Sequence, residues 1–386
     1  MRRVTDFDVV IVGGGPAGSA AGIELAREGQ KVAIVERTAA MHDKVCGDFL
    51  SGEAIEALEQ LGVGPVTLGG LPIERLRLVG SLCRSSAALP FAAQSVARRV
   101  LDEALLESAA RSGATVLRGH SAEALRCADS GWCVEVASGG ARSALRARDV
   151  VVATGKHDLR GMPRPEGKQS GLVGLKMYLR LAQAQTAELA RAIEIVLLQG
   201  GYGGLSLVEN EVANLCFVVK RTAARSLSGG WETVAAMLRE HPHLRMRLEG
   251  AEAMLARPLA INPIPYGFVR CEAIARGVWS VGDQAVVIPS FTGDGVALAL
   301  HSGRLAARRL LEGADADEFQ RELYGQVWRQ VARATVLSRA LVAQPQRTVL
   351  ELTARLWPGV LRTVATQTRL KQQFRLLQGE NRCATA

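Results

Sequence analysis

The chain has 386 residues, 48% of them hydrophobic and 22% charged, so it is long enough for two or three structural units and is not a disordered chain. Its seven cysteines form no Cys-x-x-Cys pair, which argues against a disulfide framework or a metal site and favours a reducing, cytoplasmic setting. The net charge of +9 comes with only 4% aromatic residues and no apolar run long enough to cross a bilayer, so neither a nucleic-acid-binding protein nor an integral membrane protein is indicated.

The segment DFDVVIVGGGPAGSAAGIELAREGQKVAIVER predicts a nucleotide-binding unit of strand, helix and strand. Its glycines permit a tight turn, a close approach of backbone to a pyrophosphate, and close packing of the helix on the strand. The free N–H groups of the helix N-terminus favour phosphate binding. Glu36, at the end of the second strand, can accept hydrogen bonds from a ribose hydroxyl. The residues expected at the phosphates are Gly13, Gly15, Pro16, Ala17 and Gly18.

The loop KVCGDFLSG, residues 44–52, follows the second strand. Ser51 can cap the helix that the apolar positions 54, 55, 58 and 61 predict. A second amphipathic helix ends at Gly113, and strands at 114–117, 132–137 and 149–153 then return the chain to the nucleotide-binding unit.

The stretch 168–268 has a different character, because short β-prone runs separated by Gly, Glu and Asn predict an antiparallel meander. A single helix, WETVAAMLREHPHLRMRL, is expected to follow these strands. Tyr202, in the run GGYGG, is either a turn residue or a side chain that reaches a substrate.

The segment GVWSVGDQAVVIPSFTGDGVALALHSGRLAARRL decides between FAD and NAD, which share the first fingerprint. Gly282 and Asp283 follow a strand at 279–281, and Asp283 can bind ribityl or ribose hydroxyls. The helix that opens at Val296 can stabilise negative charge on a reduced flavin. A nicotinamide dehydrogenase has no use for this second half-site, so the sequence predicts FAD. Asp294, in the turn before that helix, is either a helix cap or a catalytic group.

The C-terminal region is basic, with eleven Lys and Arg against four Glu from residue 318 onward. Arg355, Arg362 and Arg369 recur every seven residues, and an amphipathic helix is expected after the break at Trp357–Pro358. The arginines form either a solvated helix face or a surface that contacts acidic lipid or an acidic carrier protein.

The motifs GGGPAGSAAG…VER, KVCGDFLS, RRVLDEALLESAARSGATV, VVATG and GDQAVVIPSFTGDGVALALHSGRLAA together resemble the geranylgeranyl-reductase-like flavoproteins. Those proteins belong to the wider para-hydroxybenzoate-hydroxylase fold group, and the resemblance covers roughly residues 5–315. It implies FAD-binding roles for Gly13, Gly15, Gly18, Glu36, Arg37, Arg98, Gly282, Asp283, Gly293, Gly295 and Val296.

The resemblance also implies that the loop around Cys46 borders both the isoalloxazine ring and the substrate. Gly47 would let backbone lie close to the ring, and Cys46 would be a pocket wall and a weak proton donor, or else an inert buried thiol. Asp48 departs from the family's Cys-Gly-Gly run. The substrate pocket is placed beside the predicted meander, where the residues expected to face inward are Leu175, Tyr178, Leu205, Leu207 and Phe217.

We therefore expect an α/β protein with a Rossmann-like FAD/NAD(P)-binding fold of the para-hydroxybenzoate-hydroxylase type, an inserted antiparallel β-sheet substrate domain and a helical C-terminal tail. The FAD-binding domain is expected to be discontinuous, with residues 1–70, 95–160 and 270–315. The substrate domain would comprise 71–94 and 161–269, and the basic helical region 316–386.

Three functions fit this arrangement. The first is an FAD-dependent oxidoreductase that exchanges a hydride, through flavin N5, with a carbon–carbon bond of a hydrophobic isoprenoid, polyketide-like or aromatic molecule. The second is a monooxygenase that hydroxylates through a flavin C4a-hydroperoxide, and the third is a non-catalytic flavin-binding docking protein. No second Gly-x-Gly-x-x-Gly unit is present, so electrons would come from NAD(P)H visiting the flavin or from an electron-donor protein.

Overall fold

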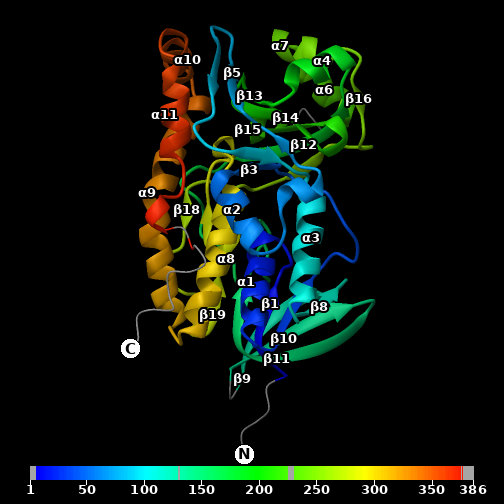
Figure 1. The fold of residues 1–386 in the computed structure, drawn as a ribbon, viewed down its shortest axis with the longest axis vertical. Helices are drawn as coiled ribbons and strands as arrows, with labels where there is room; N and C mark the ends of the chain where they lie inside the picture. The colour runs from blue at the N-terminus through cyan, green and yellow to red at the C-terminus, as the bar shows by residue number, and fades with distance from the viewer. Residues whose placement is uncertain (1–5, 129–130, 225–229, 375, 377–386) are drawn as a thin grey trace, which may run out of the picture.

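The predicted nucleotide-binding strands form the centre of a seven-stranded sheet at one end of the molecule (Figure 1). The computed structural model describes residues 6–128, 131–224, 230–374 and 376. In sheet order the strands are β8 (Thr115–Arg118), β2 (Val32–Glu36), β1 (Phe7–Val12), β11 (Ala141–Val152), β10 (Gly131–Ser138) and β9 (Ser121–Ala128), with β19 (Val278–Ser280) beside β11. The pairs of β1 with β2 and β11 are parallel, whereas β9, β10 and β11 form an antiparallel ribbon.

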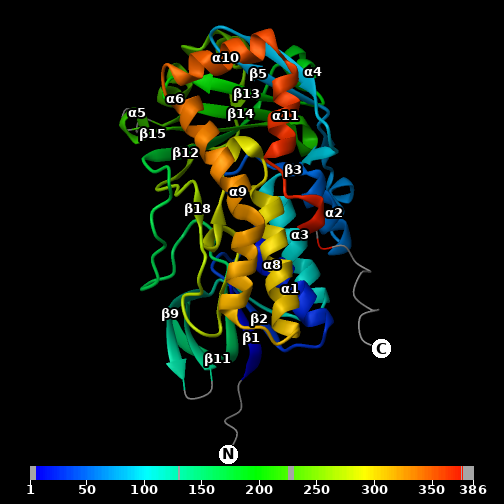
Figure 2. The same cartoon turned by 90° about the vertical axis from the view of Figure 1, so that its left-hand side faces the viewer.

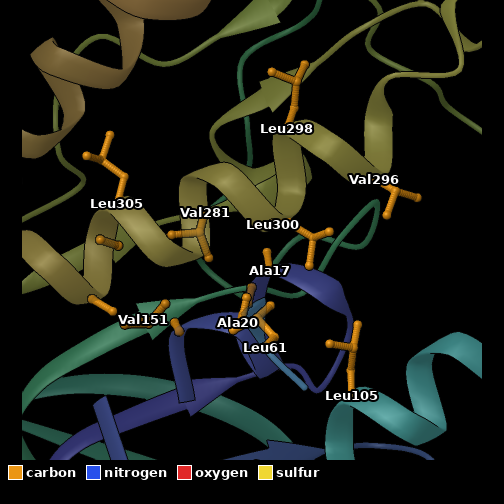
Figure 3. Close-up of a cluster of buried hydrophobic side chains, with 14 of the residues drawn as sticks. Ala17, Ala20, Leu61, Leu105, Val151, Val281, Val296, Leu298, Leu300 and Leu305 are labelled. Atoms are coloured by element: carbon orange, nitrogen blue, oxygen red, sulfur yellow. The ribbon is translucent and has the colours of Figure 1, made fainter. Parts of the chain in front are cut away.

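Helices that pack into the core of this unit with the sheet include α1 (Pro16–Arg27), α3 (Arg98–Arg111) and α8 (Gly295–Leu311). Helices α1 and α8 approach closely because their facing residues are small. A Cβ added at Gly303 would lie 2.1 Å from the carbonyl oxygen of Ala17. Figure 3 shows Ala17 and Ala20 of α1 next to Leu300 of α8, in the middle of this core.

A second sheet lies at the other end of the molecule. In order its strands are β16 (Glu252–Ala253), β12 (Leu172–Arg180), β15 (Val212–Lys220), β14 (Gly201–Val208), β13 (Ala192–Leu198), β5 (Arg75–Val79) and β6 (Arg84–Ala88), with β17 (Leu259–Ile261) beside β12. The predicted antiparallel sheet is confirmed, except that β13 and β5 pair in parallel. Tyr202 lies within β14, so it is not a turn residue.

One face of the second sheet is covered by α4 (Gln183–Leu189), α6 (Trp231–Arg239) and α7 (Pro242–Arg247), and β15 leads into the short α5 (Arg221–Ala224). The prediction of one helix from Trp231 to Leu248 is wrong. Pro242 cannot continue the hydrogen-bond ladder of α6, and it begins α7 instead.

The C-terminal helices run from the first unit to the other face of the second sheet (Figure 2). They are α9 (Ala316–Val342), α10 (Gln346–Leu356) and α11 (Gly359–Gln367). A capping box begins α9, in which the Asp315 side chain accepts the N–H of Glu318 and the Glu318 side chain accepts the N–H of Asp315. The predicted break at Trp357–Pro358 separates α10 from α11.

Short elements join the two ends. Helix α2 (Gly52–Gln60) follows β3 (Phe49–Ser51), which pairs with β7 (Ala93–Ser95) beside β4 (Leu71–Pro72), and β18 (Phe268–Val269) pairs with β20 (Val286–Val287). Ser51 is the N-cap residue of α2 as expected, but its hydroxyl donates to Asp294 instead of accepting from the helix. Among the described residues, no helix has both the length and the apolar character needed to cross a membrane.

Candidate active site

One cavity of about 800 Å³ extends from the nucleotide-binding loop to the C-terminal helices. Most of the site residues predicted from the sequence line this cavity, although they come from distant segments of the chain. Those that line it are Gly13, Gly15, Pro16, Ala17, Glu36, Arg37, Cys46, Gly47, Arg98, Tyr202, Gly282, Asp283, Gly293, Gly295 and Val296. Gly18 and Asp294 lie outside the lining.

The loop between β1 and α1 has the geometry that its glycines predict. Gly13 adopts a φ of 111°, and a Cβ there would lie 2.4 Å from the carbonyl oxygen of Ala153. A Cβ at Gly18 would lie 2.0 Å from the Gly13 carbonyl oxygen, so neither position accepts a side chain. Gly15 is different, because a Cβ there would meet only the Arg98 guanidinium, at 3.9 Å. Gly15 therefore leaves bare backbone toward the cavity.

Glu36 ends β2 and joins two backbone turns at the cavity. Its Oε2 accepts the N–H of Gly14 at 2.9 Å, and its Oε1 accepts both the N–H and the hydroxyl of Thr38 at 2.9 and 2.8 Å. Burial would raise the pKa of Glu36, but these donors outweigh it and hold the pKa below its usual value. The side chain is therefore an ionised acceptor at the cavity wall.

Arg98 begins α3, where the guanidinium forms a bidentate pair with Asp102 one turn later, at 2.7 and 2.9 Å. Lys44 contacts the same carboxylate at 2.8 Å. Burial would lower the pKa of Arg98, but the Asp102 charge raises it above its usual value. The pairing of Asp102 with Arg98 and Lys44 was not predicted, although the Arg-x-x-x-Asp spacing indicates the helical pair.

The turns near β19 and α8 present a second strip of backbone to the cavity. Gly282 and Gly293 have φ values of 58° and 69°, which favour glycine, and a Cβ at Gly293 would lie 2.5 Å from the Phe49 ring. Asp283 lines the cavity, and within the described residues its carboxylate makes no hydrogen bond or ion pair.

These features fit FAD. A Cβ added at Gly47 or Gly295 would meet no atom within 4 Å, so the cavity has open space beside bare backbone on both sides. At one end, the backbone near Gly15 can donate to phosphates and the ionised Glu36 can accept from a ribose hydroxyl. At the other end, Asp283 can accept from the hydroxyls of a ribityl chain.

The loop that carries Cys46 and Gly47 is held from behind by a buried ionic cluster. Asp48 has a positive φ of 55°, and its Oδ2 accepts from Lys176 Nζ and from the Tyr178 hydroxyl, each at 2.6 Å. Burial raises the pKa of Asp48, against the attraction of Lys176. Asn214 adds a hydrogen bond to the Cys46 carbonyl oxygen at 3.1 Å. No local sequence pattern could reveal these partners, because they lie more than 120 residues away.

The far part of the cavity is an apolar chamber between the second sheet and α9–α11. Its sheet side combines small residues with aliphatic ones, and its helix side carries mainly aliphatic ones. The sheet residues are Gly174, Ile195, Gly204, Cys216 and Val218, and the helix residues are Leu337, Leu341, Leu350, Ala354, Leu361 and Val364. Burial raises the pKa of the Cys216 thiol to about 12, so it is neutral. Tyr202 packs edge-on against Phe291, and its hydroxyl lies 3.3 Å from Ser338 Oγ.

The residues expected to face the substrate do not do so. Leu175, Leu205, Leu207 and Phe217 point to the opposite face, into the core under α6 and α7, and Tyr178 belongs to the Asp48 cluster. Both faces of this sheet are buried, and apolar residues occur on both faces of β12 and β15, so an apolar residue alone does not identify the cavity side.

Asp294 is fully buried, and it connects the turn before α8 to the C-terminal segment. It accepts from Arg369 at 2.8 Å and also from Gln330 and Ser51. Burial raises the pKa of Asp294, against the attraction of Arg369. Since Asp294 lies outside the cavity lining, this geometry favours a positioning role over contact with substrate.

The three regularly spaced arginines do not form one solvated face. Arg355 lies on α10 and Arg362 on α11, on either side of the break, and both are exposed. Arg369 lies beyond α11 and lines the cavity, with its guanidinium 4.6 Å from the Phe91 ring centroid. The seven-residue spacing therefore joins positions with different surroundings.

Known proteins similar to this chain include FAD-binding and reductase proteins. Residues 6–160 match the FAD binding domain family. Menaquinone reductase of Mycobacterium tuberculosis (strain ATCC 25618 / H37Rv) is 27% identical over 329 residues, covering 80% of this chain and 77% of that protein. Digeranylgeranylglycerophospholipid reductase 1 of Methanothermobacter thermautotrophicus is 25% identical over 333 residues, covering 79% and 77%. The chain is an FAD-dependent oxidoreductase.

This oxidoreductase also has the predicted fold and the predicted resemblance. The structure of the flavin-dependent brominase Bmp2 superposes with a TM-score of 0.76 at 17% identity, and the match covers 96% of each chain. At that identity the likeness shows the fold alone, which is the para-hydroxybenzoate-hydroxylase type. The expected resemblance to geranylgeranyl-reductase-like flavoproteins is confirmed by the reductases among the relatives.

Proposed function

We propose that this oxidoreductase reduces or dehydrogenates a carbon–carbon bond of a hydrophobic small molecule of the isoprenoid, polyketide-like or aromatic kind. The observation that carries the proposal is the continuous cavity that joins the nucleotide-binding loop to the apolar chamber. The reductase names of the curated relatives, which refer to a quinone and to isoprenoid lipids, support the same substrate class.

The protein's own residues would hold FAD and exclude water. Gly13, Gly15 and Glu36 would bind the adenosine and pyrophosphate end, and Asp283 and Gly295 the ribityl and ring end. When bound, FAD would supply hydride exchange through its N5 atom. The chamber walls would remove water from the reacting bond and align it.

Cys46 is the residue that we assign to proton transfer, because it lines the cavity beside Gly47. In the reducing direction, its Sγ–H donates a proton to the carbon next to the one that receives the hydride. The thiolate then takes a proton from water. Tyr202 would contact the substrate from β14. The reducing electrons would come from NAD(P)H or from an electron-donor protein.

The test is an anaerobic one. We expect the photoreduced, FAD-loaded protein to regain the visible absorption of oxidised flavin when menaquinone or a geranylgeranyl lipid is added without oxygen. Cys46→Ser should retain FAD but slow this reoxidation about a hundredfold and shift its pH profile, because the hydroxyl is a much weaker acid. Cys127→Ser, at an exposed position on β9, is the matched control.

Two results would reject the proposal. Reoxidation that requires oxygen, with an oxygen atom appearing in the product by mass spectrometry, would establish the monooxygenase instead. A flavin that no hydrophobic compound reoxidises, with or without oxygen, would favour the non-catalytic docking protein.

A further inference from the structure

The outer face of α10 carries bulky apolar side chains that contact solvent. Val349, Leu352 and Leu356 have the i, i+3, i+7 spacing of one helix face, with exposed fractions of 62%, 42% and 83%. Trp357, directly after the helix, is 57% exposed. Single exposed leucines are ordinary, but four large apolar residues on one short segment form a patch. We name these four residues the α10 surface.

The opposite face of the same helix lines the cavity, through Leu350, Thr353 and Ala354. The α10 surface is therefore separated from the apolar chamber by one helix, roughly 10 Å thick. Packing within the protein accounts for the apolar residues of the inner face only. Helix α10 itself lies at the end of the molecule opposite the seven-stranded sheet (Figures 1 and 2).

The charges around the α10 surface are positive. Arg355 is exposed on α10 next to Leu356, and Arg362 is exposed on α11, which contacts α10. Glu351 is the one acidic residue between positions 346 and 374, and it is only 1% exposed. Its carboxylate points inward, where it accepts the N–H of Leu82 at 2.7 Å and contacts Arg347 at 3.4 Å. The segment therefore presents cations and apolar side chains outward, without an exposed carboxylate.

We propose that the α10 surface docks on an anionic lipid bilayer. Leucine and tryptophan side chains would enter the boundary between headgroups and acyl chains, while the two arginines contact anionic headgroups. The inference rests on the proposed function, because docking would place the roof of the apolar chamber next to the phase in which a hydrophobic substrate dissolves.

Vesicle flotation tests this with the full-length, FAD-loaded protein. We expect flotation with phosphatidylcholine vesicles that contain phosphatidylglycerol, and little with phosphatidylcholine alone. Leu356→Glu with Trp357→Glu should weaken partitioning about tenfold or more, because the apolar contribution is lost. Arg355→Glu with Arg362→Glu should weaken it by at least about fivefold per arginine and reduce its salt dependence.

The matched controls are Val66→Glu, at an apolar position with 70% exposure, and Arg276→Glu, at an exposed arginine beside the first sheet. Both should float like the unmodified protein. Equal flotation of all variants, or equal binding to neutral vesicles, would overturn the proposal. A further result would also overturn it: no vesicle binding, together with a dimer in sedimentation velocity that is dissociated by Leu356→Glu with Trp357→Glu. That result would assign the surface to a second copy of the chain. Flotation requires no turnover, so failure of the docking proposal can be distinguished from failure of the proposed function, which the anaerobic flavin assay tests.

Discussion

Glu36 shows how one side chain can combine a structural and a binding task. It accepts one backbone N–H from the phosphate loop and one from the turn after β2, and it remains ionised at the cavity wall. We predict that Glu36→Arg abolishes FAD retention, because it removes the ribose acceptor and leaves the N–H of Gly14 unpaired, at a cost of about 1–3 kcal/mol. The introduced arginine would not repel the phosphates, so the loss would reflect the missing carboxylate.

The ratio of flavin to protein absorbance after purification checks this prediction. Glu36→Gln keeps one acceptor oxygen and should retain part of the flavin, while Glu28→Arg, at an exposed position on the same unit, should retain all of it. Full flavin content in Glu36→Arg would mean that this residue does not hold the cofactor.

At the scale of elements, the ion pair between Asp294 and Arg369 fastens the C-terminal segment to the turn before α8. Arg369 also donates to the carbonyl oxygen of Thr292, so it holds that turn at two points. We predict that Arg369→Met destabilises the protein by about 3–5 kcal/mol, because it leaves the buried Asp294 charge unpaired. FAD should also dissociate faster, since Gly293 and Gly295 in the same turn line the cavity.

Thermal unfolding of three variants separates the causes. Arg369→Met combined with Asp294→Asn should lose less stability than Arg369→Met alone, because no buried charge remains. Arg111→Met, which breaks an exposed pair with Glu107 at 3.7 Å, should cost about 0–1 kcal/mol. If Asp294→Asn lowered the stability of the Arg369→Met variant by as much as it lowers that of the unmodified protein, the two residues would act independently.

The same elements mark the limit of what the sequence could predict. The strands and helix around Gly13 were predictable because each element has an apolar period, a glycine turn and a terminal acid within 30 residues. The cavity face of β12 and β15 was not, because both faces are buried and carry apolar residues. The roof of the chamber was missed for a related reason: Leu350 and Leu352 belong to opposite faces of α10, one toward the cavity and one toward solvent, and their residue type does not distinguish the two.

At the scale of the whole molecule, a buried ionic cluster ties the second sheet to its helical cover. Glu194 of β13 pairs with Arg247 and His243 of α7, at 2.7 and 2.6 Å, and with Arg77 of β5 at 3.1 Å. Burial would raise the pKa of Glu194, but the hydrogen bonds and charges of His243 and Arg247 lower it to about 2. This carboxylate therefore stabilises the fold when it is ionised.

The pKa difference fixes the pH window. Because the folded pKa lies below the ordinary 4.5, the stabilisation is fully present above about pH 4.5 and is lost as pH falls toward 2. Its size is on the order of 3 kcal/mol. We predict that Glu194→Gln is less stable than the unmodified protein at neutral pH, and that the difference shrinks between pH 4.5 and 2. Thermal unfolding across this range measures it, with the exposed Glu28→Gln as a control whose difference stays near zero. A Glu194→Gln difference that does not change with pH would mean that shape, and not ionisation, makes this residue stabilising.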